Sequence, residues 1–384
     1  MIPAASFNQE RLAHLRRVIA DDVAAGRYFG AVIAVARAGH LGLHDAIGHA
    51  DSQRSRPLRR DSVFSIFSVT KAITNVLVLR SIELGRFALT TRISDLVPEF
   101  SGGLRHEITV HHLLTHTSGL PSVLAAKPDM YIDRLDEVVA AVCANIHPTE
   151  PPGERVAYSP MANHALLGEA LRRTDPNRRS YRAIVQEDLL APLKMSDTSV
   201  GLRADLRARH VVPDFRGNFP ITHPGHSNLG PNGAFQEEDA EMPWVGVAST
   251  VPDMFRFAEM LRSRGELDGA QILSPATLDL ATRNWTGEKP NELYKTAFHQ
   301  RGWQPAPAYL GLGFALRGTA MCHHLYGTLT SPGTFGNYGA GSALYWVDPA
   351  REITFVCLTA GVMDSLDNIE RFQRLSDVAV SAAL

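Results

Sequence analysis

The spacing of hydrophobic residues near the N-terminus predicts a helix followed by a β-hairpin. Between Asn8 and Ala25 apolar side chains recur every three or four residues, and Gly26 follows as a stop signal. The next run, residues 30–51, is rich in strand-forming residues, and residues 36–40 at its centre have the composition of a turn. Because so short a connection joins antiparallel strands, we expect a hairpin here.

The pattern becomes helical again at Val69. Residues 69–84 are apolar on most sides of the expected helix and are closed by Gly85, which is typical of a helix buried inside a protein. The pattern stays helical to about Arg173, and a further helix follows Phe255. The chain ends in two strand-like runs and a helix from about Asp367, and we expect these strands to pair with the early hairpin.

These elements predict an α/β (α+β) fold, with a central antiparallel sheet flanked by helices and a mostly α-helical insert. We expect residues 1–75 and 245–384 to form the α/β domain with the sheet. Residues 76–244 would form the mostly helical domain. Within it, residues 202–245 are rich in Pro, Gly, His and Asn, and we expect this long loop to line a cleft.

Composition narrows the range of partners. The 384 residues are 45% hydrophobic and carry a formal net charge of -2, so neither nucleic acid nor a membrane is expected as a partner. The first residues lack the apolar core of a signal peptide, and no stretch approaches the ~18 apolar residues of a membrane span, so we expect a cytoplasmic protein. Three widely spaced cysteines fit reduced thiols better than a disulfide framework.

Ser68 and Lys71 are the strongest candidates for chemistry. They stand three residues apart at an expected helix start, so both side chains project from one helical face. A serine hydroxyl needs a neighbouring base, and a buried lysine can serve once desolvation lowers its pKa. A serine N-cap followed by a surface lysine is the ordinary alternative, but the apolar residues on both sides favour burial of Lys71.

The chain around these residues resembles the class C β-lactamases and their esterase relatives, the family VIII carboxylesterases. The resemblance implies a β-lactamase/transpeptidase-like fold and a penicillin-binding-protein-like serine hydrolase in which Ser68 is acylated. It extends over most of the chain, through residues 64–79, 89–100, 108–121, 154–171, 191–200, 247–257 and 334–349.

The same resemblance implies roles for further residues. Tyr158 would share proton transfer with Lys71, whose cation would lower the pKa of the phenol, and two such coupled groups titrate as a pair. The backbone N–H groups of Ser68 and Ala340 would form the oxyanion hole. Substrate contacts are expected from the third motif and from neighbouring aromatic residues, namely Asn337, Tyr338, Gly339, Phe67, Trp303 and Phe335.

Two departures from the lactamase pattern indicate the substrate. Asn337 stands where lactamases carry a lysine that binds the substrate carboxylate, and Pro160 replaces the asparagine that binds an acylamido group. We therefore expect a carboxylesterase acting on small uncharged acyl esters, with no cofactor and no metal. The alternatives are an acyltransferase of the lovastatin type, a weak β-lactamase or D-aminopeptidase, or an inactive binding module. The oligomeric state stays open, a homodimer included.

Other motifs carry less weight. Residues 225–230 nearly match the G-x-S-x-G nucleophile elbow, but the second glycine is one place late. His112 and His116 have helical metal-ligand spacing without a third ligand, so we expect structural hydrogen bonds. His323 and His324 are expected to be solvated or to act behind the substrate-contacting residues. Trp346 and Tyr309 could line an acyl pocket or belong to the core.

Overall fold

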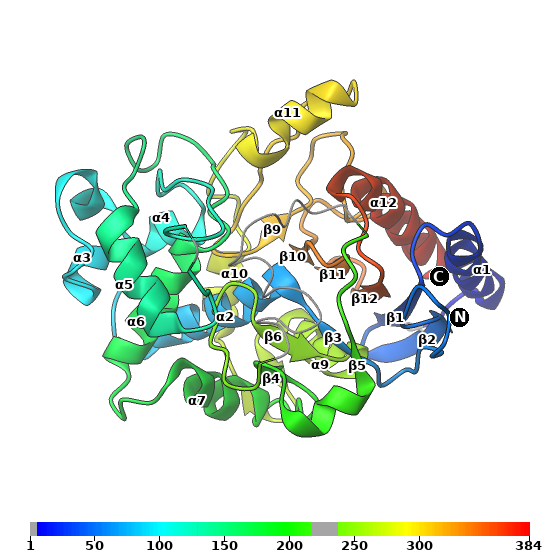
Figure 1. The fold of residues 1–384 in the computed structure, drawn as a ribbon. Coiled ribbons are helices and arrows are strands. Elements are labelled where there is room, and N and C mark those ends of the chain that lie inside the picture. The colour runs from blue at the N-terminus through cyan, green and yellow to red at the C-terminus, as the bar shows by residue number, and fades with distance from the viewer. Residues whose placement is uncertain (1–5, 129, 217–236) are drawn as a thin grey trace.

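A six-stranded antiparallel sheet forms the centre of one side of the molecule (Figure 1). The computed structural model describes residues 6–128, 130–216 and 237–384. The strand order is β2-β1-β12-β11-β10-β9. The strands are β1 (Gly30–Arg37), β2 (His40–Gly48), β9 (Ala315–Leu316), β10 (Phe335–Gly339), β11 (Ala343–Asp348) and β12 (Ile353–Ala360).

The pairing confirms the expected hairpin and its partners. β1 pairs with β2 across the turn at Ala38 and Gly39, and its other edge pairs with β12 from Gly30 opposite Ala360 to Arg37 opposite Ile353. The first and last parts of the chain therefore build one sheet. The termini come together as well, since the backbone N–H of Asn8 donates to the carbonyl of Ala382 at 2.8 Å.

Helices cover both faces of this sheet. Helices α1 (Gln9–Ala24) and α12 (Ser365–Ala382) pack on one face, and α9 (Val251–Arg262) packs on the other. Alternate residues of β1 serve the two faces, because Ile33 joins a cluster with Leu15 and Phe372 whereas Val32 joins the cluster that contains Phe257. A sheet buried on both faces explains why β1 is almost continuously apolar.

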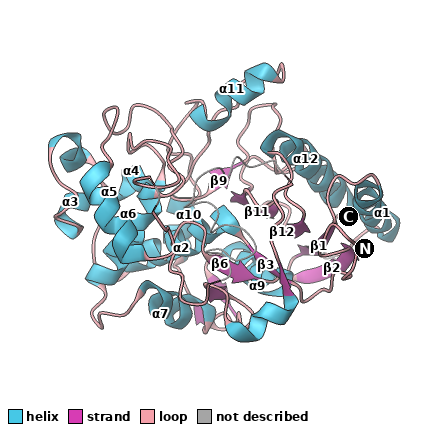
Figure 2. Cartoon of the chain, in the orientation of Figure 1, coloured by secondary structure: helices cyan, strands magenta, loops and turns pink. Residues whose placement is uncertain are grey.

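The opposite side of the molecule is mostly helical (Figure 2). Its central helix is α2 (Thr70–Glu83), which begins and ends within one residue of the helix that the sequence predicts. The other helices of this side are α3 (Ile93–Leu96), α4 (Val110–Leu114), α5 (Leu135–Asn145), α6 (Ala162–Thr174) and α7 (Tyr181–Val185). Single helical turns cover η1 (Phe67–Val69), η2 (Gly103–Glu107), η3 (Gln186–Leu190) and η4 (Ala204–Arg209).

A second, four-stranded sheet lies between the two sides, in the order β4-β6-β3-β5, and the sequence pattern does not predict it. Strands of two or three residues contain too few positions for alternation to show. The strands are β3 (Val63–Ser65), β4 (Ser199–Val200), β5 (His210–Val211) and β6 (Val247–Ser249). The remaining elements are β7 (Glu266–Leu267), β8 (Ala270–Gln271), α10 (Pro275–Ala281) and α11 (Glu292–Gln300).

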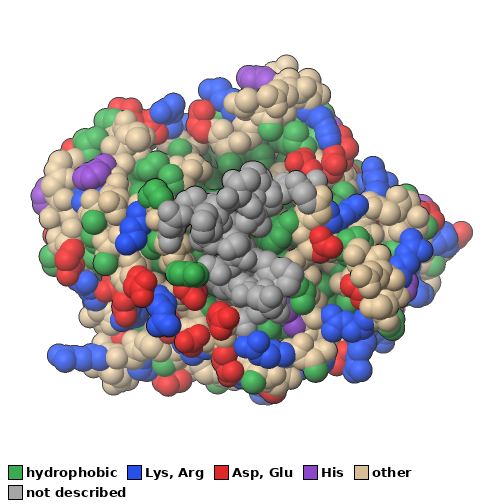
Figure 3. All heavy atoms as spheres, viewed as in Figure 1, with side chains coloured by type: hydrophobic (Ala, Val, Ile, Leu, Met, Phe, Trp, Pro, Cys, Tyr) green, Lys and Arg blue, Asp and Glu red, His purple; other side chains and the backbone are tan. Residues whose placement is uncertain are grey.

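The core is continuous across the molecule. One cluster of buried side chains includes Val32 from the large sheet, Ile73 from α2 and Leu135 from α5. The division into domains at residues 75 and 245 therefore stays a prediction. Within the described ranges, no helix combines the length and the apolar character needed to cross a bilayer. Acidic and basic side chains are interspersed on the face seen in Figure 3.

Candidate active site

Ser68 lies in a tight turn between the second sheet and the central helix. Strand β3 ends at Ser65, the turn η1 follows, and α2 begins at Thr70. Phe67 has a φ of 50°, a left-handed conformation that a non-glycine residue adopts at a cost of about 1–3 kcal/mol. The apolar residues that bury this turn hold Phe67 in that conformation, and Ser68 is thereby presented at the start of α2.

Strand β10 passes very close to this turn. A Cβ atom at Gly339 would collide with the carbonyl oxygen of Ile66 and would lie 3.3 Å from the backbone nitrogen of Ser68. A Cβ atom at Gly341 would collide with the ring of Phe67. At Gly339 a glycine is needed because two backbones approach closely, and at Gly341 the ring of Phe67 fills the space that a Cβ atom would take. Ala340, between these glycines, lines the same cavity as Ser68.

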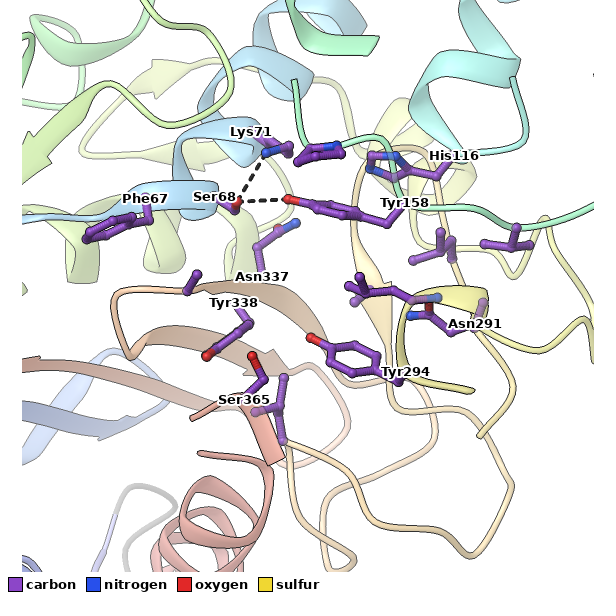
Figure 4. A pocket seen from close by; sticks show the side chains of 18 of the residues that line it. Phe67, Ser68, Lys71, His116, Tyr158, Asn291, Tyr294, Asn337, Tyr338 and Ser365 are labelled. Carbon is purple, nitrogen blue, oxygen red and sulfur yellow. Dashed lines mark hydrogen bonds between the residues drawn. The ribbon is translucent and has the colours of Figure 1, made fainter. Parts of the chain in front are cut away.

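The side chains of Ser68, Lys71 and Tyr158 meet (Figure 4). Ser68 Oγ lies 2.8 Å from the hydroxyl of Tyr158 and 3.1 Å from Nζ of Lys71. Lys71 Nζ also donates to the backbone carbonyl of Trp244 at 2.9 Å, and it lies 5.1 Å from the centre of the Tyr158 ring. Two residues of one helical turn and a phenol from the chain preceding α6 therefore share one hydrogen-bonded site.

Burial shifts the pKa values of both Lys71 and Tyr158. Desolvation lowers the pKa of Lys71 well below its ordinary value, because a charged ammonium is poorly solvated in this site. Burial also raises the pKa of Tyr158, and the hydrogen bond between Tyr158 and Ser68 only partly offsets this. The expectation that a Lys71 cation would lower the pKa of the phenol is therefore wrong. Lys71 is the stronger candidate for the base, and Tyr158 is a neutral phenol at neutral pH.

His116 holds the segment that carries Tyr158. Its backbone carbonyl accepts from the N–H of Ala157 at 3.0 Å, and its Nδ1 accepts from the N–H of Ser159 at 3.3 Å. Its ring lies 4.8 Å from the Tyr158 ring, centre to centre. Burial lowers the pKa of His116 to about 3, so Nδ1 is unprotonated and can accept. His116 thus forms the hydrogen bonds that the sequence predicts for it, on both sides of Tyr158.

Asn337 is held by hydrogen bonds within the protein. Its Oδ1 accepts from the hydroxyl of Tyr345 at 2.8 Å, and its Nδ2 donates to the carbonyl of Gly313 at 3.0 Å. Asn75, from α2, donates to the same carbonyl at 2.9 Å. The position that would carry a cation in a lactamase is therefore neutral and part of a structural network.

The site opens into a cavity of about 520 Å³. Of the six expected substrate contacts, three line it, namely Phe67, Asn337 and Tyr338, whereas Gly339 does not. Ala340, expected in the oxyanion hole, lines it as well. Two aromatic residues do not belong to its wall and support it from behind. Trp303 stacks on His323 at 3.9 Å, and the buried Phe335 packs against Phe314 at 5.4 Å.

Other residues lie differently from the sequence expectation. His323 and His324 are both part of the cavity wall, where we expected solvated or more distant residues. Trp346 is fully buried on Phe355, away from the cavity. Tyr309 donates to Glu288. Residues 225–230, the near match to a nucleophile elbow, lie outside the described residues.

Several residues that line the cavity belong to no sequence motif. Trp244, whose carbonyl binds Lys71, and Phe215 come from the loop expected to line a cleft. Tyr294 on α11 and Ser365 at the start of α12 reach the cavity from segments that have no motif. Within the described part of the chain, no group of three or more His, Cys, Asp or Glu residues could hold a metal ion.

Comparisons with known proteins agree on one family. A family model described as Beta-lactamase matches residues 15–379. Protein Rv1367c of Mycobacterium tuberculosis is 28% identical over 375 residues, covering 87% of this chain and 86% of its own length. A penicillin-binding protein homologue from Caulobacter crescentus has a TM-score of 0.78 at 25% identity over 97% of both chains. A family VIII carboxylesterase has a TM-score of 0.77 at 21% identity, with 96% of this chain and 97% of that one covered.

Proposed function

Because the chain belongs to the beta-lactamase family of penicillin-binding-protein-like serine hydrolases, we propose that it is a carboxylesterase that cleaves small uncharged acyl esters through an acyl-enzyme on Ser68. The observation that carries the proposal is the contact between Ser68, Lys71 and Tyr158, at hydrogen-bonding distances of 2.8 and 3.1 Å. The fold shared with a family VIII carboxylesterase supports an ester as the substrate.

Acylation follows from the geometry. Burial lowers the pKa of Lys71 and so favours its neutral form, in which the amine takes the proton of the Ser68 hydroxyl. The serine oxygen attacks the ester carbonyl, and the N–H groups of Ser68 and Ala340 stabilise the charge that develops on the carbonyl oxygen. Lys71 and Tyr158 then pass the proton to the leaving alcohol.

Deacylation reverses these steps with water as the nucleophile. Water attacks the acyl-enzyme carbonyl, its proton goes to the pair formed by Lys71 and Tyr158, and Ser68 leaves with a proton from the same pair. An added alcohol could replace water, which would make the enzyme an acyltransferase. Separating the acid product from the new ester in the presence of an alcohol distinguishes the two reactions.

The neutral groups near Ser68 favour an uncharged substrate. Asn337 cannot form an ion pair with the carboxylate of a β-lactam, and both ends of its amide are bonded within the protein. Pro160 lines the cavity but has no side-chain amide with which to bind an acylamido group. Recognition of lactams is thus weakened while the acylation residues remain.

A comparison of two chromogenic substrates tests the proposal. We expect kcat/KM for p-nitrophenyl butyrate to exceed that for a chromogenic cephalosporin by about 100-fold or more, since a lost ion pair and a lost amide contact can each cost about tenfold or more. Initial rates at several substrate concentrations give both constants. Faster turnover of the cephalosporin would make the chain a β-lactamase and overturn the assignment.

The position of Tyr158 gives a second prediction. His116→Phe keeps an aromatic ring but leaves the N–H of Ser159 without its acceptor. We expect kcat for p-nitrophenyl butyrate to fall about tenfold, because a small displacement of a catalytic group is costly. His112→Phe is the matched control, since the His112 ring contacts Thr109 and His111 around α4 and not the segment that carries Tyr158. Equal kcat values for the two variants would exclude a positioning role for His116.

A further inference from the structure

The cavity continues from Ser68 to a wall of neutral hydrogen-bonding side chains. Tyr294 from α11, Tyr338 from β10 and Ser365 from the start of α12 lie together on the side of the cavity away from Lys71 (Figure 4). Tyr326 and His324 belong to the same wall. We call these five residues the far wall. None of them takes part in the acyl transfer described above.

The far wall carries no charge at neutral pH. Burial raises the pKa of Tyr294 to about 12 and lowers the pKa of His324 to about 3. Burial raises the pKa values of Tyr326 and Tyr338 as well. Among the described residues that line the cavity there is no Asp, Glu or Arg, and Lys71 is the only Lys. A charged group placed in this cavity would lose its hydration without finding a counter-ion.

The far wall nevertheless contains hydroxyl groups that can donate hydrogen bonds to a ligand. The hydroxyl of Tyr338 accepts from Nδ2 of Asn368 at 3.1 Å, which leaves its own proton to donate. Tyr326 is 1% exposed, and its hydroxyl has no hydrogen-bond partner among the described residues. That hydroxyl is enclosed by protein atoms, so Tyr294 and Tyr338 are the tyrosines of the far wall whose hydroxyls we expect a ligand to reach.

The dimensions of the cavity exceed those of a short acyl chain. A volume of about 520 Å³ is in the range of sites that bind drug-sized ligands. The cavity is also lined by apolar side chains next in sequence to the far-wall residues or a few positions away, namely Leu293, Phe298, Leu325 and Ile369. A ring with oxygen substituents would contact both kinds of side chain, whereas a butyryl group would leave much of the space unfilled.

From this arrangement we propose that the natural substrate is an ester in which one half is a bulky, uncharged ring bearing ether, carbonyl or hydroxyl oxygens, bound by the far wall. The inference rests on the proposed esterase function and deepens it. The hydroxyls of Tyr294 and Tyr338 would donate to the ligand oxygens, and the four apolar residues would contact the ring.

Two matched substrate series test the inference, one for each half of the ester. The acyl series contains the p-nitrophenyl esters of phenylpropanoate, dimethoxyphenylpropanoate and carboxyphenylpropanoate. The alcohol series compares benzyl butyrate with dimethoxybenzyl butyrate. We expect the dimethoxy compound to have an about tenfold higher kcat/KM than the unsubstituted one in at least one series, which corresponds to one or two additional hydrogen bonds. The carboxylate should be the poorest acyl substrate.

Variants of the far wall connect this preference to its residues. Tyr294→Phe and Tyr338→Phe remove one hydroxyl each and keep the rings, so the ratio of kcat/KM between the dimethoxy and unsubstituted compounds should fall severalfold in each variant and approach one in the double variant. Tyr131→Phe is the matched control, because Tyr131 is 59% exposed and does not line the cavity.

Two outcomes would overturn the inference. They are equal kcat/KM values for the substituted and unsubstituted compounds in both series, and a preference that survives in the double variant. Both outcomes differ from a failure of the proposed function, in which the enzyme would not hydrolyse p-nitrophenyl butyrate at all.

Discussion

Ser68→Ala is expected to lower kcat/KM for p-nitrophenyl butyrate by about 10⁴-fold or more. The variant has no Oγ atom and therefore cannot form the acyl-enzyme, so only the oxyanion contacts and substrate binding would remain. Removal of the hydroxyl breaks hydrogen bonds to Lys71 and Tyr158 only, both inside the site, so the fold should persist. Initial rates and a thermal unfolding curve check the two parts of the expectation.

Covalent labelling tests the role of Ser68 as the nucleophile without measuring a reaction rate. A fluorophosphonate probe should modify the parent protein once, on the peptide that contains Ser68, and should not modify the Ser68→Ala variant. Ser101→Ala is the control, because Ser101 is exposed and does not line the cavity. Should the Ser68→Ala variant still be labelled, or hydrolyse the ester as fast as the parent, another nucleophile would carry the reaction.

Long, periodic elements were predictable because their pattern repeats many times. The hairpin of β1 and β2, its pairing with β12 and the buried helix α2 follow from such patterns, and the structure confirms all three. The second sheet was not predictable, because its strands have two or three residues and are joined by tertiary contacts. The local pattern therefore predicts the helix that follows Ser68 but does not predict the short strand β3 that precedes it.

The residues of the site also differ in how far the sequence alone predicts them. Ser68 and Lys71 are neighbours on one helix, so their contact follows from spacing, whereas the place of Tyr158 came only from the family resemblance. The far wall of the cavity had neither kind of signal. Tyr294 and Ser365 are about seventy residues apart in the chain, and α11 and the start of α12 bring them to the same cavity (Figure 4). Contacts of this kind depend on packing between distant segments, which periodicity does not encode.

Lys71→Met gives the second large effect, on both catalysis and stability. Methionine fills a similar volume without a base, so we expect kcat to fall by about 10²- to 10⁴-fold, the usual contribution of general acid–base catalysis. Lys127→Met serves as the control, because Lys127 is exposed and does not line the cavity. A Lys71→Met variant with the activity of the parent would show that Tyr158 or water is the base.

The stability of the Lys71→Met variant tests the pKa of the lysine directly. Burial lowers the pKa of Lys71 in the folded state, whereas in the unfolded chain it is about 10.4. Between these two values the unfolded state binds one proton more than the folded state, so the free energy of unfolding of the parent rises with pH, by about 1.4 kcal/mol per pH unit from this group. His116 and His164, whose pKa values Lys71 also lowers, are kept neutral in this pH range mainly by burial, and the other titrating groups are shared with the variant. Urea unfolding of the parent and of Lys71→Met at pH 7, 8 and 9 should therefore show the parent gaining stability relative to the variant at each step, whereas Lys127→Met should show no such trend. A difference that does not change with pH would mean that Lys71 stays protonated in the folded protein, and the amine could then not accept the proton of Ser68.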